Sequence, residues 1–129
     1  MLFDGHAYSF PDVRGVMGFP SPEAQHVHVQ KAIANHHIQC WRESDHRPAS
    51  TGTLMDQSRW PYDDCVRDVN FGPTTHGRYE WTVDDERYVK QYFPPSIVDM
   101  SYPPANLIAE MDYTQVSGAL LHRNPYVGM

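Results

Sequence analysis

Apolar and polar positions recur with different periods along the chain, and these periods predict the secondary structure. Over residues 3–8, polar side chains alternate with apolar or small ones, which is typical of a short strand. After Ser21 and Pro22, which together form a favourable helix start, apolar residues recur three and four positions apart. This spacing predicts an amphipathic helix over residues 21–41.

Three further patterns follow in the second half of the chain. Residues 78–93 carry aromatic and β-branched side chains on both sides of an acidic turn, which predicts a β-hairpin. Apolar side chains one turn apart follow Pro103 and Pro104 and predict a second helix. The short apolar run over 116–121 is typical of a buried parallel strand. This order of elements indicates an α/β fold class.

The composition indicates one folded unit without a nucleic-acid partner. A length of 129 residues predicts a single compact unit, and 40% apolar against 20% charged residues is a balance typical of folded chains. Ten Lys and Arg stand against sixteen Asp and Glu, so the formal net charge of -6 provides no positive field for binding phosphates. The eleven Pro predict a loop-rich chain.

Cysteine usage and hydropathy predict a cytoplasmic protein with no membrane partner. The two cysteines, Cys40 and Cys65, are too few for a small secreted domain built on disulfides. No stretch approaches the roughly 18 consecutive apolar residues of a membrane-spanning helix. The N-terminal residues also lack the basic and apolar segments of a targeting signal.

Four segments resemble a known enzyme family. The motif DGHAY at 4–8 and the run LIAEMDYTQVSGALL at 107–121 resemble the first and second βα units of the amidohydrolase-related (amidohydrolase 2) metal-dependent hydrolases, which are TIM barrels. The stretches GRYEWTV at 77–83 and QYFPPSI at 91–97 are similar to an insertion that some members carry after the first strand.

The resemblance implies the first βα units of a TIM-type (β/α)8 barrel. It places a loop-rich insertion over approximately 11–102, which contains the helix over 21–41 and the hairpin over 78–93. A complete barrel needs eight strands and about 250 residues. Residues 1–129 are therefore expected to form a single N-terminal portion of an amidohydrolase-like domain, an incomplete barrel.

The resemblance also implies site residues. In this family the first strand ends in His-x-His, where two imidazoles on one face of the strand hold a divalent metal ion, zinc or manganese. His6 stands at the first position and is the expected metal ligand, whereas Tyr8 replaces the second His and is expected in the pocket wall. Asp4 is expected to orient His6, and His122, at the end of the second apolar run, is expected to line the same pocket. No catalytic residue is assigned.

The implied function is hydrolysis, or a related decarboxylation, of a small organic substrate, and the chain alone is expected to be inactive. Two alternatives stay open. The first is a non-catalytic, truncated or split fragment that assembles with a second copy or with a complementing C-terminal chain, because two orphan parallel strands leave exposed edges and apolar faces. The second is a small α+β binding domain organised by the hairpin over 78–93.

Overall fold

The computed structural model describes residues 1–36, 39–59 and 63–124. Three short 3-10 helices, at Thr51–Leu54, Gln57–Arg59 and Asp63–Cys65, lie between the third and fourth strands. In chain order, the strands and α-helices are β1 (Phe3–Ala7), α1 (Pro22–His36), β2 (Gln39–Arg42), β3 (Pro48–Ser50), β4 (Gly72–Pro73), β5 (Arg78–Val83), β6 (Glu86–Gln91), α2 (Pro104–Thr114) and β7 (Gly118–Leu121).

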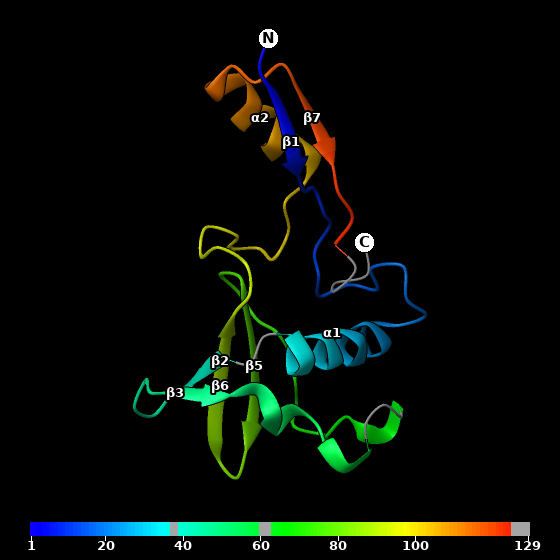
Figure 1. Ribbon diagram of the computed structural model, residues 1–129, viewed down its shortest axis with the longest axis vertical. Coiled ribbons are helices and arrows are strands. Elements are labelled where there is room, and N and C mark those ends of the chain that lie inside the picture. Colours follow the sequence, from blue (N-terminus) through cyan, green and yellow to red (C-terminus); the bar gives the residue numbers. More distant parts are fainter. Residues whose placement is uncertain (37–38, 60–62, 125–129) are drawn as a thin grey trace.

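These elements form two parts (Figure 1). β1, α2 and β7 lie together at one end and are called the terminal unit here, and residues 10–102 form the central region, with α1 and the other strands. Phe10 and Tyr102 join the two parts through a pair of backbone hydrogen bonds, in which each N–H donates to the other residue's carbonyl at 2.9 Å. The two chain segments that lead to the terminal unit are therefore held side by side.

The central region contains a five-stranded antiparallel sheet in the order β3-β2-β6-β5-β4. The hairpin predicted over 78–93 corresponds to β5 and β6, whose ends meet where Val83 pairs with Glu86. Asp84 and Asp85 form the two-residue loop, with positive φ angles of 49° and 63°. A loop with two positive φ angles matches the twist of a hairpin, and Asp tolerates this conformation better than most residues.

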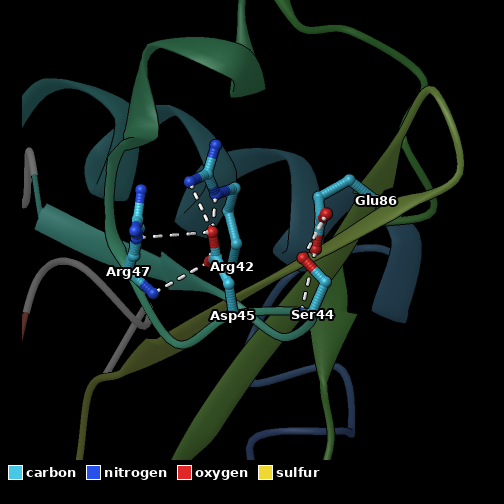
Figure 2. Close-up of polar contacts among 5 residues, drawn as sticks. All are labelled: Arg42, Ser44, Asp45, Arg47 and Glu86. Carbon is cyan, nitrogen blue, oxygen red and sulfur yellow. Dashed lines mark hydrogen bonds and ion pairs between the residues drawn. The ribbon is translucent and has the colours of Figure 1, made fainter.

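Figure 2 shows how polar contacts stabilise the turn between β2 and β3. The Asp45 carboxylate accepts hydrogen bonds from the Arg42 guanidinium, at 2.7 Å to Nη2, and from the Arg47 backbone N–H, at 3.0 Å. The Ser44 hydroxyl donates to the Glu86 carboxylate at 2.7 Å and thereby ties this turn to the start of β6. Every side chain in this network lies at the surface, so each pair contributes little stability by itself.

The hydrophobic core lies in the central region. Along β5 buried and accessible positions alternate, so Tyr79 and Trp81 point to the same face and are almost completely buried. Val29 and Ile33, four residues apart on α1, are fully buried in the same cluster. Ser21 caps this helix, because its hydroxyl accepts a hydrogen bond from the Ala24 N–H at 3.2 Å. The sheet and α1 thus share one core.

The terminal unit has almost no core. β1 and β7 pair in parallel, and of the described residues on these two strands only Ala7 is buried. No residue of α2 is buried. Leu120 and Leu121 are 53% and 58% exposed. Because consecutive residues of a strand point to opposite faces of a sheet, these two side chains lie on different faces. Both faces of this two-stranded sheet therefore present apolar side chains to solvent.

The prediction of the first βα units of a TIM-type barrel is wrong. A barrel of that type repeats a parallel strand and a helix, whereas five antiparallel strands lie between β1 and β7 in this chain. The structure is a small α/β arrangement with a five-stranded antiparallel sheet and a separate two-stranded parallel sheet. The stretch 11–102, expected to be an insertion, provides the core cluster of the described protein.

The helix predicted over 21–41 ends earlier than its apolar pattern suggests. α1 ends at His36, and β2 begins at Gln39. Cys40 and Trp41 lie in β2, where they pair with β3, and Trp41 also pairs with Val89 of β6. Because β2 pairs with the neighbouring β3 and also with β6, which is far away in sequence, strand pairing overrides the helical periodicity here. Within the described ranges, neither helix has the length and apolar character needed to cross a membrane.

Candidate functional site

The structure brings together three of the residues predicted for the site. His6 and Tyr8 come from the end of β1 and the residues after it, and His122 follows β7 directly. The His122 backbone N–H donates to the Ala7 carbonyl at 2.8 Å, which continues the parallel pairing past the end of β7. Because the two strands are parallel, their carboxyl ends lie at one edge, and both imidazoles meet there.

A β-bulge in β1 between Asp4 and Ala7 changes the direction of the side chains near His6. Asp4 pairs with Ala119 and Ala7 pairs with Leu121, so three steps along β1 match two steps along β7. Such a β-bulge bends the strand locally and changes the direction of its side chains. Asp4 contributes to this bend, because its carboxylate accepts a hydrogen bond from the His6 backbone N–H at 2.9 Å. The contact of Asp4 is therefore with the His6 backbone, whereas a contact with its imidazole was expected.

Hydrogen bonds orient both imidazoles. The Nε2 atom of His6 lies 2.7 Å from the Tyr8 hydroxyl, and the Nε2 atom of His122 lies 2.9 Å from the Gly5 carbonyl oxygen. A carbonyl only accepts, so His122 carries a proton on Nε2, and the neutral ring then has its lone pair on Nδ1. The two rings stack, with centroids 4.2 Å apart and planes 19° from parallel.

This arrangement does not fit a divalent metal ion shared by His6 and His122. An imidazole binds a metal through a lone pair that lies in the plane of its ring. Since the two rings are stacked, their lone pairs lie in nearly parallel planes and do not converge on one point. The Tyr8 hydroxyl also occupies the Nε2 side of His6. Among the described residues, no group of three or more His, Cys, Asp or Glu has a metal-binding arrangement.

Tyr8 and His122 of this cluster each line a different cavity, whereas His6 lines neither. Asp4 and Tyr8 line an open cleft of about 1120 Å³ between the terminal unit and the chain segment that follows β6. His122 lines a smaller cavity of about 550 Å³. Two imidazoles and a phenol can donate and accept hydrogen bonds and can transfer protons, so the cluster could interact with a polar group bound in either cavity.

Tyr102 and Glu110 belong to the cleft but were not predicted from the sequence. Burial, and after it the interaction with the Glu110 carboxylate, raises the pKa of Tyr102 to about 12. Tyr102 reaches this position through its backbone pairing with Phe10, a residue far away in sequence. No local pattern reports such a pairing, so the sequence held no signal for these two residues.

Comparisons with known proteins identify no relative: no family model, no curated protein and no solved structure matches this chain.

Proposed function

We propose that the protein functions by assembly, through the binding of its terminal unit to a second polypeptide that completes the two-stranded parallel sheet. The observation that carries this proposal is the exposure of Leu120 and Leu121 on opposite faces of that sheet. Parallel sheets in proteins are covered on both faces, and their strands are correspondingly apolar. β7 has this apolar sequence without the cover.

The edges of the same sheet support pairing with further strands. Within the described residues, β1 and β7 have only each other as neighbours, so one side of each strand has backbone groups without a strand partner. Unpaired edges of this kind accept a strand from another chain. Phe3 and Ile108, which are 65% and 56% exposed, extend the apolar surface beside the strands. Strand pairing and apolar burial can thus act together in one interface.

The charges of the terminal unit favour a basic partner over a second copy. Over residues 1–8 and 104–123, the charged side chains are Asp4, Glu110, Asp112 and Arg123. Two copies would bring carboxylates against carboxylates, which costs free energy, whereas Lys or Arg around the partner's apolar surface would complement them. The proposed occupant is therefore a different polypeptide that supplies strands and an apolar surface with a basic rim.

The test compares hydrogen exchange and complex formation in matched variants. In the free chain, we expect the amides of β1, α2 and β7 to exchange much faster than those of β5 and β6. A polypeptide captured by the chain should protect β1 and β7, and its binding should weaken with salt and in Leu121→Lys. Val27→Lys, on the exposed side of α1, is the control and should bind as the wild type does.

Two results would contradict assembly with a different polypeptide. One is a free monomer in which β1 and β7 are as protected as β5 and β6, because such a unit would need no cover. The other is self-association in sedimentation velocity that Leu121→Lys abolishes, because a second copy would then be the occupant.

The second candidate function is hydrolysis or related decarboxylation of a small molecule in the assembled state, as the family resemblance implies. The observation that favours it is the meeting of His6, Tyr8 and His122 beside two cavities. Turnover of ester and carboxylate substrates by the complex should fall at least tenfold in His6→Asn and in His122→Asn. His46→Asn is the control, since His46 is exposed in the turn between β2 and β3. Equal turnover in all variants would contradict this function.

A further inference from the structure

We propose that the cleft between the terminal unit and the segment after β6 binds a small organic cation with an aromatic body, of the arylalkylamine class. The cleft shares Asp4 and Glu110 with the acidic surface of the terminal unit, but Leu120 and Leu121, on which assembly is proposed to depend, do not line it. The cleft has a volume of about 1120 Å³, which is sufficient for a small organic molecule. Three features of its lining select the ligand: aromatic side chains, acidic side chains and the absence of basic ones among the described residues.

The aromatic side chains form a connected group along the cleft. The Phe10 and Phe93 rings stack with centroids 4.9 Å apart, and Tyr92 meets Phe93 edge to face, also at 4.9 Å. The Tyr102 and Phe10 ring centroids lie 6.4 Å apart. Phe10 and Phe93 are more than nine-tenths buried and belong to the core cluster, so this wall is anchored in the central region. Because Phe10 and Phe93 are buried against each other, the half-buried rings of Tyr92 and Tyr102 are the aromatic surface that this wall offers to a flat apolar body and to a cation.

Every charged side chain among the described lining residues is acidic. These side chains are Asp4, Asp99 and Glu110, and no Lys or Arg accompanies them. Asp99 has the nearby Arg14 as an electrostatic partner. In the described part of the chain, Asp4 and Glu110 form no ion pair, and Asp4 accepts its hydrogen bond from the neutral His6 backbone N–H. Two carboxylates thus lie in one cleft without a positive charge to balance them.

A cation is the ligand that this combination favours. A protonated amine can donate charge-assisted hydrogen bonds to the carboxylates while its aromatic body contacts the rings of the wall. A carboxylate or phosphate ligand would be repelled by the same side chains. The formal net charge of -6 on the whole chain adds a field that concentrates cations near the surface. Tyr102 lines the same cleft as Glu110 and interacts with its carboxylate.

The experiment measures binding of three probes that share one aromatic body. Phenethylamine is the cation, phenethyl alcohol is neutral, and 3-phenylpropionate is the anion, and each is titrated into the full chain by calorimetry and by NMR. We expect phenethylamine to bind at least about tenfold more tightly than the other two probes, and to bind more weakly at high salt. Shifts of the Phe10, Phe93 and Tyr102 ring signals should locate the bound probe in the cleft.

Variants on α2 separate a specific contact from general attraction to an acidic protein. Glu110→Gln should weaken phenethylamine binding about tenfold or more, because it removes the charge on one hydrogen-bond acceptor. Asp112→Asn removes the same charge from the same helix outside the lining and should leave binding unchanged. Circular dichroism checks that both variants fold. Equal binding of the cation and the anion, no binding of phenethylamine at millimolar concentration, or equal loss in the two variants would each overturn the proposal. None of these results bears on assembly, which Leu121→Lys tests.

Discussion

The two helices of this protein have opposite relations to the rest of the chain. α1 buries Val29 and Ile33 completely against the sheet of the central region, whereas no residue of α2 in the terminal unit is buried. Yet α2 also has an apolar stripe, with Leu107, Ile108 and Met111 one turn apart. An amphipathic helix becomes part of a core only where a second layer covers its apolar stripe. The central region has that second layer, and the terminal unit has too little of it.

The same difference separates the two sheets. The five-stranded sheet has α1 and the long connections packed against it, so Tyr79 and Trp81 are nearly inaccessible to solvent. The two-stranded sheet has Leu120 and Leu121 exposed on opposite faces. We therefore expect folding stability to depend on the central region, and binding to depend on the terminal unit and the cleft beside it. Substitutions in the two regions test that division.

Truncating the largest buried side chain should cost the most stability. Trp81 is 1% exposed, and its indole N–H donates to the Thr53 hydroxyl at 2.9 Å. Trp81→Ala should lower the free energy of unfolding by about 3–5 kcal/mol, measured by urea denaturation with circular dichroism. Tyr113→Ala on α2, where Tyr113 is 90% exposed, should change it by less than about 0.5 kcal/mol. Similar losses in the two variants would contradict the proposed division.

Thiol reactivity should also differ between the buried central region and the exposed helix α2. Cys40 is 4% exposed in β2, and burial raises the pKa of its thiol to about 11. At pH 8 the native thiol should react with iodoacetamide on the order of a hundredfold more slowly than in the unfolded chain, because less thiolate is present. A cysteine introduced by Tyr113→Cys should react at the unfolded rate. Mass spectrometry of each peptide gives the two rates, and rapid native alkylation of Cys40 would show that this part of the core opens easily.

Replacing glycine by alanine should lower the free energy of unfolding at Gly77 in the central region but hardly at Gly5 in the terminal unit. Gly77 has a φ of +76°, and a Cβ atom there would lie 2.3 Å from the Phe93 carbonyl oxygen. Gly77→Ala should therefore destabilise the protein by about 2 kcal/mol or more. A Cβ atom at Gly5 in β1 would meet no atom within 4 Å, so Gly5→Ala should change stability by less than about 1 kcal/mol. The midpoints of urea denaturation compare the two variants, and equal midpoints would contradict the close packing at Gly77.

The smallest expected effect is a pH dependence at the turn in Figure 2. A hydrogen bond from the Arg47 backbone N–H, together with the Arg42 guanidinium, holds the pKa of Asp45 below its usual value. A carboxyl whose pKa is lower in the folded state stabilises the fold above its unfolded pKa of about 3.9, and this stability is lost as the pH falls through the folded pKa.

Asp45→Asn should therefore be less stable than the wild type at neutral pH, and the difference should shrink below about pH 4. Urea midpoints at neutral and acidic pH provide the measurement. A difference that grows on acidification would contradict this role of Asp45.

Several local elements could be read from the sequence because short-range chemistry encodes them. Ser21 and Pro22 begin α1 where their capping chemistry predicts, and the aromatic pattern over 78–93 corresponds to β5 and β6. The predicted end of the first helix failed at Cys40 and Trp41, because β2 pairs with the nearby β3 and with β6, which is distant in sequence. The barrel prediction failed for the same reason, since local motifs do not report which strands pair.

For the candidate site, the identity of three residues was predicted from the sequence, but their arrangement was not. The family resemblance implied His6 and Tyr8, the end of the second apolar run suggested His122, and parallel pairing brings the three residues together. The stacking of the two imidazoles, the contact of Asp4 with the backbone, and the Tyr102 and Glu110 pair in the cleft depend on contacts between distant segments. The sequence therefore indicated where polar chemistry gathers, and the tertiary structure decided its geometry.

Residue type and spacing alone specify the periodic elements, the acidic balance and the apolar character of the last strand. The packing of distant segments is needed to show that the stretch expected to be an insertion holds all of the core cluster except Phe10, and that both faces of the β1–β7 pair are open. The physical reason is that burial depends on which surfaces meet after the chain folds. An apolar stripe predicts that one side of a helix or strand becomes buried, but the packing of distant segments determines which element buries it.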